Sequence, residues 1–150
     1  MYHAIVRRRT RGIFEQLSRG EWREMTGDLA DGFTHVFPGN HALGGERHSR
    51  EAMERWFERL HRLFPDLNFE VKRVVAKGWP WDTLVAVEWT DHGRAADGEP
   101  YENQGAHWIR LRWGKGTYVH AYLETERVAY ACRRMAAAGI EEAAAAPITD

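Results

Sequence analysis

The sequence predicts an α+β domain in which a curved antiparallel sheet wraps around helices and encloses a cone-shaped interior. In the first part of the chain, apolar residues recur at helical spacing, as in amphipathic helices. From about residue 67 to residue 124, apolar and polar residues alternate in runs separated by turns, as in antiparallel strands with one buried face. Helices packed on one face of such a sheet give a two-layer domain whose interior can hold a ligand.

Helical periodicity predicts four helices. The clearest follows Ser49, a suitable N-cap residue, and ends before Pro65. Its apolar residues share one face, which we expect to be buried, although its aromatic side chains could also wall a pocket. A short helix after Gly20 and a C-terminal helix are also expected. The four expected helices span residues 3–18, 21–29, 50–64 and 126–139.

Strands and turns account for most of the remaining chain. A short strand over residues 32–37 precedes a glycine-containing loop over residues 39–48. Long strands follow, and they could be sequential antiparallel neighbours. The expected ranges of these long strands are residues 67–77, 83–90, 103–113 and 117–124.

The chain length and composition fit one domain. Its 150 residues, 43% hydrophobic and 12% aromatic, can bury a sizeable core. We therefore expect a single domain over residues 1–150, with its core at about residues 3–139. The alanine-rich tail, residues 140–150, lacks the pattern of a regular element, and we expect no structure there.

Charge and cysteine content exclude several classes of partner. Twenty-one Lys and Arg residues against 22 Asp and Glu residues give a net charge of -1, so no global field would attract nucleic acid or an anionic membrane. A single cysteine, Cys132, suits a reducing compartment. No apolar run approaches the roughly 20 residues of a membrane span, and the N-terminus lacks the order of a signal peptide. We expect a cytoplasmic protein without nucleic-acid or membrane partners.

The hairpin at residues 103–124 contains the polar side chains of greatest interest. Its turn could lie at Gly114-Lys115 or at Lys115-Gly116, and the sequence leaves both open. In either register, four polar side chains share one face with an apolar strand side, because directly opposed residues point the same way. A bulge that adds one residue would reverse this relation. The four side chains, which we expect to face inward, are His107, His120, Tyr122 and Glu124.

Two imidazoles and a phenol in an apolar interior could perform proton transfer, since the ordinary pKa of imidazole, about 6.5, lies near working pH. The alternative is that these side chains pair with one another or with buried water in the core. His35, His107 and His120 lack the tight spacing of metal ligands, so we expect no metal. Nucleotide-binding and serine-nucleophile motifs are also missing, and we expect no cofactor.

Short motifs spread from about Ile13 to Val128 together carry a family resemblance. They include Phe37-Pro38-Gly39, Trp56-Phe57, Phe64-Pro65-Asp66-Leu67, Asn103-x-Gly105-x-His107 and His120-x-Tyr122-x-Glu124. On these residues the chain resembles the SnoaL-like polyketide cyclases, within the nuclear-transport-factor-two-like and ketosteroid-isomerase-like superfamily. The resemblance implies a cone-shaped fold that hosts isomerases, cyclases, dehydratases, epoxide hydrolases and binding domains.

The resemblance also implies functional residues. His107 matches a pocket histidine of the cyclases, whereas Tyr122 stands where the cyclases have an acid/base Asp. A phenol is a poor general base but a good hydrogen-bond donor. The implied reaction is proton transfer on a hydrophobic carbonyl substrate, with His107 or His120 moving the proton and Tyr122 polarising the oxygen. Residues expected to assist or to line the pocket are His35, Trp56, Phe57, Trp89, Asn103, Ile109 and Glu124.

Two alternatives stay open. In the first, a carboxylate such as Glu124 or Asp91 activates water in a hydratase, dehydratase or epoxide hydrolase. In the second, a noncatalytic module binds a lipophilic ligand without turnover. The resemblance further implies a homodimer formed through the exposed sheet face, where Trp108 would suit a partly covered surface.

Overall fold

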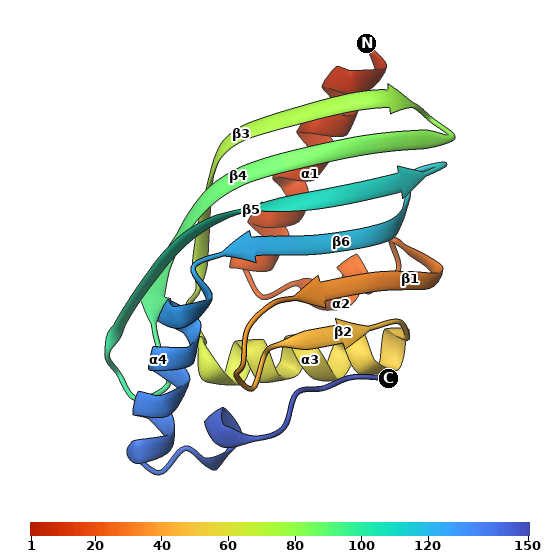
Figure 1. Cartoon of the computed structure of the whole chain (residues 1–150). Helices are drawn as coiled ribbons and strands as arrows, with labels where there is room; N and C mark the ends of the chain where they lie inside the picture. Colours follow the sequence, from red (N-terminus) through yellow and green to blue (C-terminus); the bar gives the residue numbers. More distant parts are fainter.

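A six-stranded sheet curves around the interior of the protein, and α1 runs behind β3 to β5 in Figure 1. The computed structural model describes residues 1–150 and confirms the predicted α+β fold. None of the helices is long and apolar enough to cross a membrane. The elements are α1 (Tyr2–Ser18), α2 (Trp22–Thr26), β1 (Leu29–Phe37), β2 (Gly45–Arg47), α3 (Arg50–Leu63), β3 (Asn68–Trp79), β4 (Asp82–Arg94), β5 (Pro100–Arg112), β6 (Lys115–Leu123), α4 (Thr125–Ala137) and a 3-10 helix (Glu141–Ala144).

The strands lie in the order β2-β1-β6-β5-β4-β3. As the alternation predicted, β3 to β6 are sequential antiparallel neighbours. In contrast, β1 runs parallel to β6, with His35 beside Val119, so the sheet is mixed rather than wholly antiparallel. A parallel pair needs a long crossover, and here α3 and β3 to β5 separate the two strands in sequence. The alternation within a short strand carries no information about such a distant partner.

The region expected to be a loop, residues 39–48, contains the short strand β2. This strand pairs antiparallel with β1 and places Arg47 opposite His35 on the inner side of the sheet. Directly after it, Ser49 caps α3 as predicted, since its Oγ accepts a hydrogen bond from the backbone N–H of Ala52 (3.1 Å).

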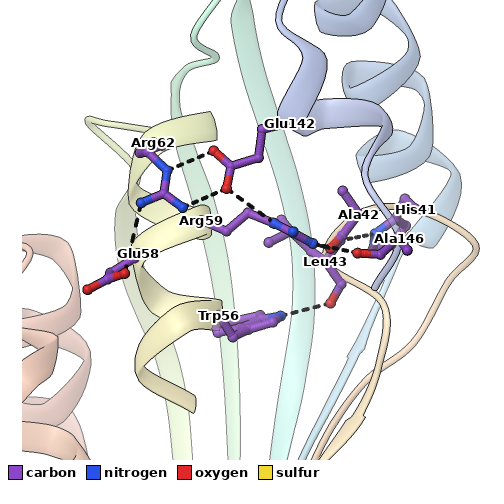
Figure 2. Close-up of polar contacts among 9 residues, drawn as sticks. All are labelled: His41, Ala42, Leu43, Trp56, Glu58, Arg59, Arg62, Glu142 and Ala146. Carbon is purple, nitrogen blue, oxygen red and sulfur yellow. Dashed lines mark hydrogen bonds and ion pairs between the residues drawn. The ribbon is translucent and has the colours of Figure 1, made fainter. Parts of the chain in front are cut away.

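The C-terminal tail lies against α3, whereas no structure was expected for it. Glu142 accepts hydrogen bonds from both Arg62 and Arg59, and Arg59 also donates to two backbone carbonyl groups (Figure 2). At the chain end, the Asp150 carboxylate accepts from the backbone N–H groups of His48 and Ser49. The expectation failed because the tail takes its structure from charged partners on other elements, and a pattern of alanines does not show such partners.

The β5–β6 hairpin turns earlier in the chain than either expected turn. Its two central residues are Trp113 and Gly114, with φ angles of 50° and 76°. Two successive positive φ angles are typical of a type I′ turn, whose twist matches that of the flanking strands. This turn alone would place His107 directly opposite His120.

A bulge at Thr117 reverses that relation. Thr117 is an extra residue on β6, where the pairing register shifts, and its hydroxyl donates to the carbonyl oxygen of Arg110 (3.2 Å). Beyond the bulge, His107 lies opposite Ala121, and His120 points to the other side of the sheet. The expectation that His107 and His120 share a face is therefore wrong.

Candidate functional site

The concave side of the sheet, α1 and α3 enclose a cavity of about 420 Å³. Hydrophobic residues make up 25 of the 34 that line it, so it suits an apolar ligand. Trp56 is held in the wall because its indole N–H donates to the carbonyl oxygen of Leu43 (2.8 Å; Figure 2). The lining includes the four expected wall residues, which are Trp56, Phe57, Trp89 and Ile109.

His107 is one of the few polar side chains that line the cavity. Its Nδ1 accepts a hydrogen bond from the indole Nε1–H of Trp89 (2.8 Å), and its ring packs edge-on against Phe14. Because an indole nitrogen can only donate, the neutral His107 ring carries its proton on Nε2. Burial lowers the pKa of His107 to about 4. At neutral pH the ring is therefore uncharged, and its Nε2–H is a fixed donor.

His35 repeats this arrangement on β1. Its Nδ1 accepts a hydrogen bond from Nη1 of Arg47 (2.6 Å), and a guanidinium, like an indole, only donates. Burial and the charge of Arg47 lower the pKa of His35 well below its usual value, so this ring is also neutral with its proton on Nε2. Since His35 also lines the cavity, two imidazoles of defined tautomer border the same space.

Asp91 is a buried carboxyl group in the cavity wall, on the inner face of β4 together with Trp89. Asp91 is 4% exposed, and its Oδ1 has no hydrogen-bond partner. No other buried side-chain nitrogen or oxygen in the protein lacks a partner. Burial raises the pKa of Asp91 from 3.8 to about 7, so this group can take up or release a proton near neutral pH.

Asp91 and His107 flank the indole of Trp89. Asp91 lies two positions after Trp89 on the same face of β4, and His107 accepts from the indole nitrogen. On β4, the residue opposite His107 is Val87. At the usual strand rise, the backbone from Val87 to Asp91 is about 13 Å long. A ligand that contacts both groups must therefore extend across the indole.

Tyr101 and Asn103 surround the Asp91 end of the cavity. Asn103, which lies opposite Asp91, is buried and donates from Nδ2 to the Tyr101 hydroxyl oxygen (3.0 Å) and to the carbonyl oxygen of Glu124 (3.0 Å). Tyr101 lines the cavity, whereas Asn103 stands behind it. Burial and the nearby Asp91 raise the pKa of Tyr101, so its hydroxyl stays protonated and can donate a hydrogen bond.

Four predicted site residues do not line the cavity: Asn103, which stands behind its wall, and three residues that point away from it. His120 is on the outer sheet face, where its ring stacks on Tyr122 (centroids 4.1 Å apart) and its Nδ1 lies 2.7 Å from the Tyr118 hydroxyl. Tyr122 is 54% exposed, and the Glu124 carboxylate contacts surface residues. The assignment of His120, Tyr122 and Glu124 to the pocket is wrong, because the bulge at Thr117 inverts the expected faces.

Sequence reasoning gave Asp91 only a secondary role and overlooked Tyr101. The signal for Asp91 is the alternation along β4, which continues past the expected end of that strand at Thr90 and puts Asp91 on the buried face. Tyr101 carries the same signal on β5, because it lies an even number of positions before His107 and so shares its face. Longer strands than the sequence predicted bring both residues into the cavity.

Comparison with known proteins places the chain in a family. A family model described as a SnoaL-like domain matches residues 10–119. No curated protein matches the sequence.

Solved structures share the fold. An NTF2-like protein from Anabaena variabilis is 23% identical with a TM-score of 0.68, over 81% of this chain and 87% of that chain. An NTF2-like protein of unknown function from Burkholderia pseudomallei is 14% identical with a TM-score of 0.71, over 81% of this chain and 92% of that chain. A candidate polyketide cyclase from Xanthomonas campestris is 21% identical with a TM-score of 0.61, over 78% and 88% of the two chains. These identities establish a common architecture and leave the reaction to the site itself.

Proposed function

Because the chain belongs to the SnoaL-like domain family, we propose that it is an enzyme of the isomerase or cyclase type that transfers a proton on a hydrophobic carbonyl compound. The observation that carries this proposal is Asp91, a residue in the wall of an apolar cavity whose Oδ1 is buried and has no hydrogen-bond partner. A buried carboxyl oxygen without a hydrogen-bond partner destabilises a fold, so its presence at the cavity wall points to a functional role. Its pKa of about 7 suits a general acid or base.

In this proposal Asp91 removes a proton from a carbon atom of the substrate. The electron pair of the broken C–H bond moves onto the carbonyl oxygen, which becomes an enolate oxygen. His107 donates its Nε2–H to that oxygen, and donors already in place are effective because they need no reorganisation as charge develops. Asp91 then returns the proton to a second position. The proton carrier is thus Asp91 rather than an imidazole, because His107 has a pKa of only about 4.

The spacing of the two groups favours a conjugated substrate. Since Asp91 and His107 lie on either side of the Trp89 indole, the reacting carbon and the carbonyl oxygen must be separated along the molecule. Conjugation between them carries the electron pair from carbon to oxygen. Apolar walls such as Trp56 and Phe57 would bind the hydrocarbon part and exclude water.

The experiment is proton exchange on a bicyclic octalone, a conjugated hydrophobic ketone, followed by NMR in D₂O. The protein is expected to catalyse deuterium incorporation at the carbon remote from the carbonyl group. Asp91→Asn should reduce the rate about a thousandfold, and His107→Ala should reduce it about a hundredfold. His120→Ala is the matched control, because it removes the same ring from the neighbouring strand on the outer face, and it should leave the rate unchanged.

Other outcomes would contradict the proposal. Octalone binding without exchange above the buffer rate would favour the noncatalytic ligand-binding alternative. Addition of water to the double bond, detected by mass spectrometry and lost in Asp91→Asn, would favour the hydratase alternative. Equal losses in His107→Ala and His120→Ala would remove His107 from the reaction.

A further inference from the structure

Three exposed tryptophans form a cluster at one end of the sheet. Trp79 and Trp81 belong to the β3–β4 hairpin tip, and Trp113 belongs to the β5–β6 tip; they are 62%, 53% and 68% exposed. The rings of Trp79 and Trp81 stack with centroids 6.0 Å apart, and those of Trp81 and Trp113 are 6.1 Å apart. Large apolar side chains gathered in this way on a surface usually mark an interaction site.

The backbone holds this tryptophan cluster in place. The N–H of Trp113 donates to the carbonyl oxygen of Pro80 (2.7 Å), which ties the two hairpin tips together. Trp113 also adopts a φ angle of 50°, a conformation that is costly for a bulky residue and that glycine or asparagine would adopt more easily. The fold therefore presents an indole outward at a position where local backbone preference opposes it.

The cluster lies beside an opening of the cavity. Ile5 and Trp113 are exposed, yet both line the cavity, so the cavity reaches the surface between the first turns of α1 and the hairpin tips. The start of α1 is fixed to the same end, because the Tyr2 hydroxyl bonds to Thr83 and His3 Nε2 lies 2.7 Å from the carbonyl oxygen of Gly78. Exposed Ile5 thus extends the apolar surface of the cluster.

The charge around the cluster is positive, although the whole chain carries -1. Residues 77–82 and 110–115 contain four basic residues and one acidic residue, Asp82. The Asp82 carboxylate is already paired with Arg110 (2.9 Å). Lys77 and Arg112 are exposed and form no ion pair. The cluster is therefore flanked by basic side chains that no acidic group neutralises.

From these observations we propose that the tryptophan cluster docks on a membrane surface that contains anionic lipids. Indole rings favour the boundary between lipid headgroups and acyl chains, where the ring is apolar and its N–H meets polar groups. None of the three indole N–H groups in the cluster donates to another protein group. Lys77 and Arg112 would lie against the anionic headgroups. An apolar compound could then pass from the bilayer into the cavity without crossing water.

Vesicle flotation tests this proposal with the full chain. The protein should float with vesicles containing about one third phosphatidylglycerol and much less with pure phosphatidylcholine, and added salt should weaken the binding. Trp81→Ala combined with Trp113→Gly should lower the partition coefficient by at least about tenfold. Lys77→Ala combined with Arg112→Ala should lower it roughly thirtyfold. Trp108→Ala, an exposed tryptophan on the outer sheet face, is the matched control and should bind as the wild type does.

Several results would overturn the proposal. These are absence of wild-type binding, equal binding to neutral and anionic vesicles, and an equal loss in the Trp108 control. A change from dimer to monomer in the Trp81/Trp113 variant without lipid would assign the cluster to a second copy of the chain instead. Glycine at position 113 suits the positive φ angle, so the variant should fold; if its circular dichroism spectrum changes, Trp79→Ala with Trp81→Ala replaces it.

Discussion

His107 and His120 stand on neighbouring strands of one hairpin, yet their surroundings differ completely. His107 faces an apolar cavity, and the Trp89 indole fixes its tautomer. His120 faces outward, bonds to a tyrosine hydroxyl and stacks on the half-exposed Tyr122. The types of residue next to each histidine do not explain this difference, because one extra residue in the intervening strand decides it. The chemistry open to an imidazole here depends on register more than on local sequence.

The largest expected effect concerns the buried carboxyl on the inner face. Asp91 has a raised pKa, so between about pH 4 and pH 7 the folded protein holds more protons than the unfolded chain, and the free energy of unfolding falls as pH rises. Asp91→Asn should remove this fall, so its stability relative to the wild type should increase by up to about 4 kcal/mol across that range. Urea denaturation at a series of pH values measures the difference, with exposed Glu124→Gln as control.

The lowered pKa of His107 has the opposite effect on the free energy of unfolding, which it makes rise with pH. This effect is present in both the wild type and Asp91→Asn. Its contribution to stability is present above pH 6.5 and is lost as pH falls to about 4. Taking the difference between Asp91→Asn and the wild type cancels this contribution. A difference that does not change with pH would contradict the assignment of a raised pKa to Asp91.

The two histidines should also differ in their contribution to stability. His107→Ala leaves the Trp89 indole N–H unsatisfied and opens space in the core, so it should cost about 1–3 kcal/mol. His120→Ala removes a side chain from the outer face and should cost less than about 1 kcal/mol. Urea denaturation at neutral pH compares the two variants. Equal costs would mean that the inner and outer faces do not differ in the way the register indicates.

Trp89→Phe should change His107 without removing it. Without the indole N–H, the neutral ring is free to carry its proton on either nitrogen, and we expect about a fivefold loss of octalone exchange. Nitrogen-15 NMR of the imidazoles should show a mixture of tautomers for His107, whereas the signals of His120 should not move. An unchanged tautomer at His107 would show that other contacts fix the ring.

The smallest expected effect on folding is at the outer face. Tyr122→Ala should alter the stability of the monomer by less than about 0.5 kcal/mol, because the side chain is largely exposed. The homodimer implied by the family resemblance remains a prediction, and this substitution should weaken it if the outer face forms the contact. Light scattering over a range of protein concentrations measures the molecular mass of the wild type and of Tyr122→Ala. A monomeric wild type would contradict the predicted dimer.

Local periodicity was sufficient to predict much of the fold. The helix capped by Ser49 and the order of β3 to β6 follow from patterns contained within each segment. The cavity walls at Trp56 and Trp89 were predictable for the same reason, since apolar faces must be buried. The parallel pairing of β1 with β6 was not, because it joins segments that are far apart in sequence.

The candidate site was less predictable than the fold. The hydrogen bond from Trp89 to His107 and the one from Arg47 to His35 each join different strands, and both require a known register. Asp91 was underestimated because the expected strand ended at Thr90, directly before it, whereas β4 continues to Arg94. The positions of His120 and Tyr122 depended on a bulge, and no sequence signal distinguishes Thr117 from an ordinary strand residue.

The extra threonine in β6 has a consequence for how this scaffold could diversify. Removing Thr117 would shift the register of β6 by one residue, so its later side chains would exchange faces. The imidazole of His120 and the phenol of Tyr122 would then face the interior, and Ala121 would face outward. A one-residue insertion or deletion in β6 would thus change which side chains of this strand face the cavity, which a single substitution does not do. If a related chain lacks the residue that matches Thr117, an alignment without a gap there would pair side chains of the inner face with side chains of the outer face.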